Sequence, residues 1–525
     1  MSARFRRELV RPKLDYPRIA YHELLRRTAE RAPDKWATVF DDQTLTFREL
    51  EGLSNGLANG LRDLGVAKGD RVALFMSNRP EYLISFEAAS KAGAVLTPIN
   101  PAYHEQEAEY QLNDSEARVL ILHEDRLPIV DAIRSRIPSV QHVLVVGAAD
   151  APRTRSWYEV ATSSPATRPP DIALDLERDL IALPYSSGTT GLPKGVMLTH
   201  RNLVCNAVQC TSAGRMNDRD ILLLFLPFYH IYGTMLMGAS VASGATMCIM
   251  ERFDVHTALS LTERYRVTLF YAVPPVLLAL EQLADLKKYD VSSVRYIMSG
   301  AAPLPPEVGR RMQELTGIRV LQGYGLTEAS PLTHLNPVDN PELIRLDSVG
   351  WRVSDQEEKI VDPDDPAREL GPDAVGELII RGPQVMQGYW KAPEETARAL
   401  RDGWLHTGDI ARKDADGYVY IVDRKKEMIK YKGFGIAPAE LEALLHEHPA
   451  VADCAVVAKR DPDAGEIPRA FVVRRPGAGV SAHEIMQFVA ERVAGYKQIR
   501  AVEFVGEIPK NPSGKILRRV LKDRA

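Results

Sequence analysis

Short apolar runs alternate with helical patterns through the N-terminal part of the chain, and this rhythm constrains the fold more than any other feature. Thr46 and Glu49 have the spacing of a capping box, and leucines then recur at helical spacing over 50–64. Apolar runs at 71–76 and 94–97 have the length of buried strands, with a helical pattern between them. Strand, helix and strand in this order predict an α/β fold in which helices cover both faces of a parallel sheet.

The pattern changes in the C-terminal part of the chain. Short strand patterns at 377–381 and 417–422, with turn residues between them, predict a β-rich region. A highly charged segment follows at 423–428, and beyond it two helical and three strand patterns predict a small α+β unit of about a hundred residues. We therefore expect a large N-terminal domain over 1–425 and a small C-terminal domain over 426–525.

The composition argues against several classes of protein. Across 525 residues, Lys and Arg number 66 and Asp and Glu number 70, which gives a net charge of −4 without a block of like charge. A protein that binds nucleic acid unspecifically through a basic face is therefore not expected. The 4 cysteines form no CxxC pair and no Cys/His cluster, which argues against a zinc site, an iron–sulfur cluster or a disulfide framework. A reducing compartment fits this cysteine usage, and we expect a cytoplasmic protein.

One stretch, at 221–250, contains no Asp, Glu, Lys or Arg and needs separate consideration as a membrane span. Pro227, several glycines and several hydroxyl-bearing residues interrupt it, so we predict a buried strand, a helix and a second strand instead. The first 18 residues also lack the apolar core of a signal peptide. We therefore expect no integral membrane segment.

The segment at 186–195 reads SSGTTGLPKG, and its residue types suit an oligophosphate. Small residues let backbone N–H groups approach phosphate oxygens, while hydroxyls and a lysine add donors and positive charge. Pro193 and Gly195 exclude the Walker A pattern, and a flexible surface loop is the alternative interpretation. The residues that we expect to contact the phosphates are Ser186, Ser187, Gly188, Thr189, Thr190, Gly191 and Lys194.

Six segments, in the same order, resemble motifs of the adenylate-forming superfamily, which includes acyl-CoA synthetases, coumarate–CoA ligases, firefly luciferase and the adenylation domains of peptide synthetases. They are SSGTTGLPKG at 186–195, SGAAPL at 299–304, GYGLTE at 323–328, WLHTGD at 404–409, DRKKEMIKYKGF at 423–434 and PSGKILRR at 512–519. The resemblance spans nearly the whole chain. It implies a large domain of parallel-rich sheets with a β-rich subdomain, and a small, mobile α+β domain that acts as a catalytic lid.

The resemblance also implies a set of residues around ATP. Tyr324 would stack on adenine, and Thr327 would contact the α-phosphate. Glu328, together with Thr189, would hold Mg²⁺, because a carboxylate lies favourably beside phosphates only with a cation between them. The ribose hydroxyls would be held by Asp409 and Arg424, and the small residues against adenine and the acyl chain would be Gly300, Ala301, Ala302 and Gly323.

Three lysines in the C-terminal part of the chain would have separate roles, again by resemblance. Lys515 would bridge the substrate carboxylate and the α-phosphate, where an ammonium between two anions stabilises the transition state. Lys426 would be the hinge about which the small domain swings, and Lys430 would then face the coenzyme A tunnel. At Gly435 the chain departs from coumarate–CoA ligases and luciferase, which carry glutamine, so a side-chain contact there is missing or supplied elsewhere.

The acyl substrate is the least constrained part of the predicted function. His230 would shape or gate the acyl and pantetheine channels, although a histidine in an apolar run is commonly a hydrogen-bonded core residue. The other pocket residues expected by position are Tyr232, Met235, Met298, Ala302, Gly323 and Ala329. Because methionine-rich walls adapt to flexible chains, we expect a medium- or long-chain fatty acid. An aryl acid such as a cinnamate or benzoate comes second, and a sterol-type side-chain acid stays open.

We therefore predict an ATP-dependent carboxylic acid–CoA ligase that works through an acyl-adenylate and releases pyrophosphate and AMP. ATP, Mg²⁺ and coenzyme A are the small molecules that it would use. A protein that loads a carrier domain is one alternative, and a non-catalytic nucleotide or lipid sensor is another. The retained nucleotide-binding and catalytic residues argue against the sensor. The oligomeric state stays open, with a homodimer as one option.

Overall fold

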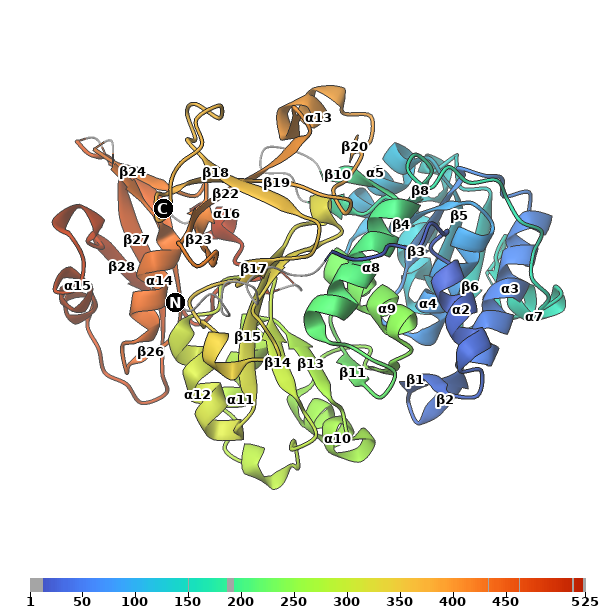
Figure 1. The fold of residues 1–525 in the computed structure, drawn as a ribbon, viewed down its shortest axis with the longest axis horizontal. Helices are drawn as coiled ribbons and strands as arrows, with labels where there is room; N and C mark the ends of the chain where they lie inside the picture. Colours follow the sequence, from blue (N-terminus) through green and yellow to red (C-terminus); the bar gives the residue numbers. More distant parts are fainter. Residues whose placement is uncertain are drawn as a thin grey trace.

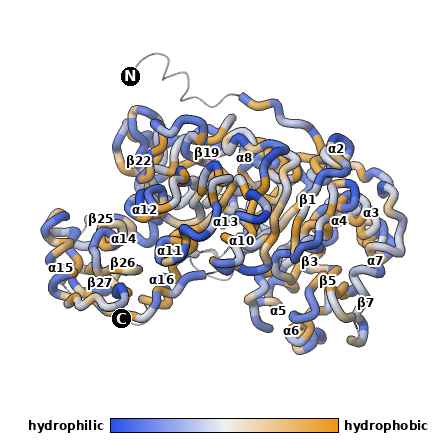
Figure 2. The backbone as a smooth tube through the Cα atoms, turned by 90° about the horizontal axis from the view of Figure 1, so that it is seen from below, coloured by the Kyte–Doolittle hydropathy of each residue, from blue (hydrophilic) through white to orange (hydrophobic). Residues whose placement is uncertain are grey.

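The computed structural model shows a large N-terminal domain and a smaller C-terminal domain of α/β type, as the sequence predicts (Figure 1). It describes residues 13–149, 151–186, 193–432, 434–461, 463–511 and 514–522, with only the backbone of Phe434. In Figure 2 the C-terminal helices and strands form a separate lobe at one end of the molecule. The expected boundary between residues 425 and 426 falls between β23 (Val419–Arg424) and β24 (Ile429–Tyr431) and stays a prediction.

One sheet of the large domain contributes the strand ends that later form the site. Its order is β17-β16-β15-β14-β13-β11-β12-β1-β2, and the run from β15 to β1 is parallel, whereas both edges are antiparallel. The uncharged stretch at 221–250 forms β11, α9 and β12 in turn, which confirms the predicted strand, helix and strand. The strands are β1 (Trp36–Phe40), β2 (Gln43–Thr46), β11 (Ile221–Leu224), β12 (Thr246–Ile249), β13 (Leu269–Ala272), β14 (Tyr296–Ser299), β15 (Arg319–Gly325), β16 (Leu332–Leu335) and β17 (Trp351–Arg352).

A second sheet of the large domain has the order β20-β10-β8-β4-β3-β5-β6-β7, and β9 pairs with β10 beside this path. The strands from β8 to β7 are parallel, and β10 is antiparallel to its partners. The strands are β3 (Arg71–Phe75), β4 (Val95–Pro98), β5 (Ala117–His123), β6 (His142–Val146), β7 (Arg155–Ser156), β8 (Leu180–Ala182), β9 (Tyr185–Ser186), β10 (Lys194–Thr199) and β20 (Gly388–Tyr389).

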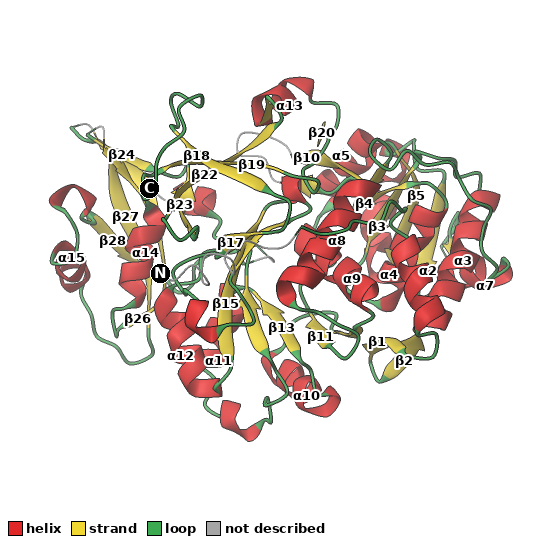
Figure 3. Ribbon diagram, viewed as in Figure 1, coloured by secondary structure: helices red, strands yellow, loops and turns green. Residues whose placement is uncertain are grey.

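Helices pack against these sheets, as the alternating pattern predicts (Figure 3). The helix expected over 50–64 is α3, which begins at Phe47 and carries the capping box of Thr46 and Glu49. In the described part of the chain, no helix is long and apolar enough to cross a membrane. The helices of the large domain are α2 (Glu23–Arg31), α3 (Phe47–Asp63), α4 (Pro80–Lys91), α5 (Glu105–Ser115), α6 (Leu127–Ile133), α7 (Trp157–Ser163), α8 (His200–Gly214), α9 (Ile231–Ser243), α10 (Val255–Tyr265), α11 (Pro274–Glu281), α12 (Pro306–Thr316) and α13 (Pro393–Ala399).

The predicted β-rich region is a five-stranded sheet, and the C-terminal domain is built on another. The first contains β18 (Glu357–Val361), β19 (Gly376–Arg381), β21 (Leu400–Arg401), β22 (Trp404–Lys413) and β23. The second contains β24, β25 (Phe434–Ile436), β26 (Val451–Asp461), β27 (Gly465–Arg474) and β28 (Ala501–Phe504), with α14 (Pro438–His446), α15 (Ala482–Ala490) and α16 (Arg518–Lys522). The C-terminal domain has hydrophobic clusters of its own, separate from the core of the large domain, which agrees with its being a distinct unit.

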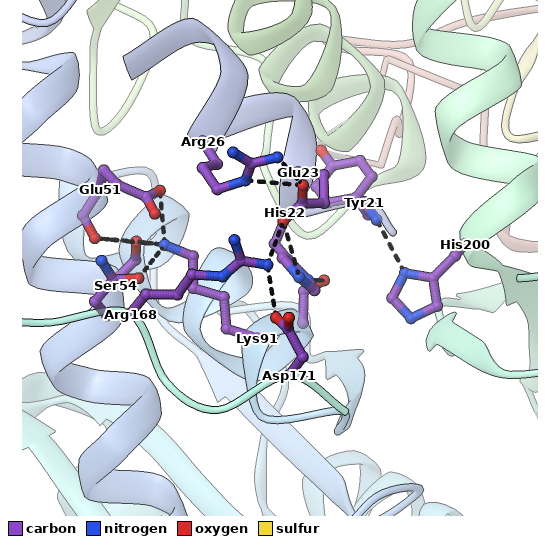
Figure 4. A network of polar contacts seen from close by, with 12 residues as sticks. Tyr21, His22, Glu23, Arg26, Glu51, Ser54, Lys91, Arg168, Asp171 and His200 are labelled. Atoms are coloured by element: carbon purple, nitrogen blue, oxygen red, sulfur yellow. Dashed lines mark hydrogen bonds and ion pairs between the residues drawn. The ribbon is translucent and has the colours of Figure 1, made fainter. Parts of the chain in front are cut away.

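A buried polar network connects α3 and α4 of the large domain (Figure 4). The side chain of Lys91, at the end of α4, is 4% exposed, and its Nζ donates to Glu51 Oε2 at 2.7 Å. The same ammonium donates to Ser54 Oγ at 2.7 Å and to Asn55 Oδ1 at 2.8 Å. All three acceptors lie on α3, so the three N–H groups of one lysine tie α4 to α3.

Candidate active site

A cavity of about 830 Å³ lies where the carboxyl ends of β14 and β15 meet the C-terminal domain. Ligands of parallel α/β sheets commonly bind at this edge. The predicted residues that line the cavity are Ser186, Lys194, His230, Tyr232, Met235, Met298, Gly300, Ala301, Gly323, Tyr324, Thr327, Glu328, Arg424, Lys426 and Lys515. Those that do not line it are Ala302, Ala329, Asp409 and Lys430. Ser187, Gly188, Thr189, Thr190 and Gly191 lie outside the described residues.

The end of the cavity where we expect the phosphates, called the phosphate end below, contains Ser186 and Lys194. Ser186 in β9 and Lys194 in β10 are register partners, so they lie opposite each other on paired strands. Lys194 Nζ lies 3.1 Å from Glu395 Oε1 and 5.9 Å from the centroid of the Tyr389 ring. Tyr389 Oη in turn donates to Glu328 Oε1 at 2.8 Å. One lysine, one tyrosine and two carboxylates thus form a polar cluster at this end.

The GYGLTE segment supplies the next part of the wall. It forms the end of β15 and continues into the 3₁₀ turn η4 (Thr327–Ala329). This turn brings Thr327 and Glu328 to the cavity, whereas Ala329 is fully buried and does not line it. The expected acyl-pocket contact of Ala329 is therefore not seen in this structure.

Tyr324, in the cavity wall, forms a hydrogen bond with the ion pair of Asp409 and Arg424. Its hydroxyl donates to Asp409 Oδ2, and Arg424 Nε donates to Asp409 Oδ1 at 2.7 Å. Asp409 and Arg424 are register partners on β22 and β23, which explains why the two motifs meet. Burial raises the pKa of Asp409, and the Arg424 guanidinium opposes this rise. Arg424 lines the cavity while Asp409 lies behind Tyr324, and their contact with a ribose stays a prediction.

An apolar part of the cavity lies between α9 and the ends of β14 and β15. Tyr232 Oη donates to Met298 Sδ at 3.3 Å, which joins the two walls. A Cβ atom at Gly323 would lie 2.9 Å from Met298 Cε, and one at Gly300 would lie 3.2 Å from the Tyr232 ring. Glycine at these two positions therefore permits the close approach of both side chains.

His230 has a structural task in addition to lining the cavity. It is the N-cap of α9, and its Nδ1 accepts a hydrogen bond from the backbone N–H of Tyr232 at 3.2 Å. Burial lowers the pKa of His230 to about 4, and the nearby Lys515 ammonium lowers it further. The imidazole is therefore neutral at pH 7, which suits the expected shaping role and not acid–base work.

Lys515 reaches the cavity from the C-terminal domain. Gly514, with φ of +80°, turns the chain against Pro275 of α11, where a Cβ would lie 3.0 Å from Pro275 Cδ. Burial lowers the pKa of Lys515 to about 8, and the cationic Arg424 and Lys426 act in the same direction. The lysine is thus held against other cations, which favours an anion between them.

Lys430, by contrast, lies outside the cavity. It is the register partner of Gly435 in the β24–β25 hairpin, and its backbone N–H donates to Glu466 Oε2 at 2.7 Å. A Cβ at Gly435 would lie 3.1 Å from Met428 Cε, so the end of the Met428 side chain lies beside the position where coumarate–CoA ligases and luciferase carry a glutamine side chain. Of the two lysines expected to act in the two half-reactions, Lys515 therefore lines the cavity and Lys430 lies on the hairpin.

Sequence reasoning missed several cavity residues. Tyr389 and Glu395 come from β20 and α13, about two hundred positions after the lysine that they approach. Neither belongs to a recognisable motif, and neither has a local pattern that distinguishes it from a surface residue. Other cavity residues without such a signal are Tyr103, Gln111, Tyr229, Glu377, Arg398 and Arg401, whereas His406 and Lys425 lie within the motifs at 404–409 and 423–434 but were not singled out.

Two family models match most of the chain. One, described as "AMP-binding enzyme", matches residues 25–390, and the other, described as "AMP-binding enzyme C-terminal domain", matches residues 440–515. Among curated proteins, 4-coumarate–CoA ligase 1 of Petroselinum crispum is 41% identical over 491 residues, which cover 92% of this chain and 89% of that protein.

Solved structures agree with these matches over nearly the whole length. The anthranilate CoA ligase AuaEII, in complex with anthranoyl-AMP, is 30% identical with a TM-score of 0.90, and the likeness covers 97% of each chain. ATP-bound MatB from Rhodopseudomonas palustris is 29% identical with a TM-score of 0.88, covering 96% of this chain and 99% of that one.

Proposed function

The chain belongs to the AMP-binding enzyme family, and from that membership we propose that it activates an aryl carboxylic acid, of the cinnamate or benzoate type, for transfer to coenzyme A. It is an acid–CoA ligase that works through an acyl-adenylate, as the sequence predicts. The proposal concerns the acid. The methionine-containing wall by itself favours a medium- or long-chain fatty acid, but the relatives support the aryl acid better.

The observation that carries this proposal is the 41% identity, over 92% of the chain, with a protein named as a 4-coumarate–CoA ligase. The geometry of the apolar part of the cavity agrees with it. Tyr232 and Met298 are joined by a hydrogen bond, and both are buried, so they form a fixed wall. A flat, rigid ring loses less conformational freedom against such a wall than a flexible acyl chain does.

We place Lys515 at the first half-reaction. A carboxylate oxygen of the acid attacks the α-phosphorus of ATP, the bond to the bridging oxygen breaks, and pyrophosphate leaves with that electron pair. Two anions must approach each other in this step, so a positive charge between them stabilises the transition state. Lys515 is the C-terminal ammonium that lines the cavity beside Arg424 and Lys426, which supports this role.

Mg²⁺ fits the donor set at the phosphate end. Glu328 brings a carboxylate to the cavity, and Tyr389 orients one of its oxygens while the other stays available to a hard cation. When bound there, Mg²⁺ would neutralise phosphate charge and orient the oxygens. No group of three or more His, Cys, Asp or Glu capable of holding a metal occurs among the described residues, so the phosphates would supply further ligands.

The second half-reaction needs a different face of the small domain. The thiol of coenzyme A attacks the acyl carbon of the adenylate, and AMP leaves with the electron pair of the cleaved bond. We assign the Lys430–Gly435 hairpin to this step and Lys426 to the hinge, because the hairpin lies outside the cavity while Lys515 lines it. Rotation of the C-terminal domain would move Lys515 out of the cavity and bring the Lys430–Gly435 hairpin to it.

The test is a mass-spectrometric panel with purified protein, MgATP and coenzyme A. The acids are 4-coumarate, cinnamate, benzoate, anthranilate and saturated chains from short to long. We expect thioester and AMP with the aryl acids, with a kcat/KM at least tenfold above that of any saturated chain (about 1.4 kcal/mol of discrimination). A preference for a saturated chain would overturn the proposal. Acyl-adenylate without thioester would instead indicate a carrier protein as the acceptor.

A further inference from the structure

The ammonium of Lys194 is already engaged by a carboxylate. Its Nζ lies 3.1 Å from Glu395 Oε1, and both side chains line the cavity at its phosphate end. The two side chains are only partly exposed, at 25% for Lys194 and 36% for Glu395. The pKa of Glu395 lies below its usual range, mainly because of its hydrogen bond with Lys194, which agrees with an ion pair.

This pair has a consequence for any anion that enters. A lysine bonded to a carboxylate presents less positive charge to phosphate oxygens, and the carboxylate itself repels them. Among the described groups beside the pair, Tyr389 is neutral and Glu328 adds a second negative charge, while Arg398, which also lines the cavity, offsets only part of the charge of Glu395. A triphosphate that uses Lys194 must therefore take the ammonium away from Glu395.

We propose that Glu395 is an exchange partner of Lys194 that competes with the phosphates of ATP and of pyrophosphate, and so sets the affinity of the enzyme for both. The inference rests on the assignment of Lys194 to the phosphates in the proposed function. Before ATP binds, Glu395 holds the ammonium at the cavity wall. After pyrophosphate leaves, the ion pair forms again. No covalent bond changes in this exchange, and Glu395 acts only through Lys194.

The position of Glu395 makes a matched control available. Its neighbour Glu394 also lies in the first turn of α13 and carries the same charge. Glu394 Oε2 lies 3.5 Å from Arg398 Nη2, its side chain is 82% exposed, and it does not line the cavity. Replacing either glutamate by glutamine removes one charge from the same turn, although Glu394→Gln also releases Arg398, which lines the cavity. A larger effect in Glu395→Gln than in Glu394→Gln therefore reports the pair with Lys194.

The experiment compares wild type, Glu395→Gln and Glu394→Gln in three measurements: the Kd of ATP without acid, the KM of ATP, and inhibition by pyrophosphate. We expect Glu395→Gln to lower Kd and KM about two- to fivefold, the range of a partly exposed ion pair, and to tighten pyrophosphate inhibition by a similar factor. Glu394→Gln, which leaves the pair with Lys194 intact, should change each of these constants less than Glu395→Gln does. Unchanged or weakened ATP binding by Glu395→Gln would overturn the inference.

A second background separates this inference from the proposed function. In Lys194→Ala, ATP binding should weaken. Adding Glu395→Gln to this variant should then tighten ATP binding less than Glu395→Gln does in the wild-type background. If Lys194→Ala leaves ATP affinity unchanged, the phosphate assignment itself fails. If it weakens ATP binding but Glu395→Gln alone does not tighten it, the assignment stands and only the exchange role is wrong. A thermal unfolding curve for each variant checks that the fold is retained.

Discussion

Lys515 is a residue whose ordinary chemistry is changed by its surroundings. An exposed lysine has a pKa near 10.4, whereas burial among Arg424 and Lys426 lowers that of Lys515 to about 8. Removing this side chain takes away the one ammonium that the C-terminal domain offers for adenylation in the proposed mechanism. We expect Lys515→Ala to lower adenylate formation from ATP by about 10²- to 10³-fold. Thioester formation from supplied acyl-adenylate should be nearly unchanged, and quenched-flow assays of each half-reaction separate the two.

The same residue predicts a pH dependence. The protonated lysine is the active form and predominates below its pKa of about 8 in the enzyme without ligands, so the rate of adenylation at subsaturating ATP and acid should fall as the pH rises through 8. The rate is measured from pH 6 to 10 by pyrophosphate release. Lys515→Arg serves as the comparison, because an arginine keeps its charge over this range and any activity that it retains should not fall in this way. A wild-type rate that stays constant to pH 10 would contradict the role of the ammonium.

At the scale of elements, the contact of Lys91 on α4 with α3 tests how much a buried charged hydrogen-bond network contributes to stability. Lys91 donates to Glu51, Ser54 and Asn55, and its removal leaves three acceptors without their common donor. We expect Lys91→Ala to lower the free energy of unfolding by about 3–5 kcal/mol, measured by urea denaturation.

Arg48 offers a control on the same helix. Its Nη2 lies 3.0 Å from Asp34 Oδ1, but the two side chains are exposed. Water and salt screen such a pair, so Arg48→Ala should change the free energy of unfolding by less than about 1 kcal/mol. Equal losses in the two variants would mean that the buried position of Lys91 has no special importance.

At the scale of the whole molecule, an ion pair between Glu281 and Arg475 links the two domains while Lys515 lines the cavity. Glu281, at the end of α11, is held by Arg311 Nε at 2.8 Å and approached by Arg475 of the C-terminal domain at 3.6 Å. Because Gly514 packs against the start of α11, this helix contacts the C-terminal domain at both of its ends. The pair therefore favours the arrangement that we assign to adenylation.

Breaking this pair should shift the balance between the half-reactions. We expect Arg475→Ala to slow adenylation about two- to fivefold, while thioester formation from supplied adenylate does not slow. Single-turnover rates of each step measure this, and Arg492→Ala is the control, since Arg492 pairs with Glu491 of its own domain. A parallel loss in both steps would show that Arg475 serves general stability instead.

Much of the fold could be predicted because its signals are local. The capping box of Thr46 and Glu49 acts over three residues, and the uncharged stretch at 221–250 folded as its turn residues indicate. The family motifs likewise supply a large share of the residues that line the cavity, since each motif is continuous in sequence. Ala302 belongs to such a motif and Ala329 directly follows one, yet neither lines the cavity, because the backbone direction at each turn decides which side chains face inward.

The sequence by itself therefore determined the α/β class, the two-domain plan and the kind of chemistry, through periodicity, caps and motifs that act over short distances. Only the tertiary structure decided that Glu395 holds Lys194, that Tyr389 orients Glu328, and that the cavity receives Lys515 while Lys430 stays on its hairpin. The physical reason is that these contacts join strands and helices far apart in the chain. Their geometry follows from sheet order and domain packing, which no local pattern encodes.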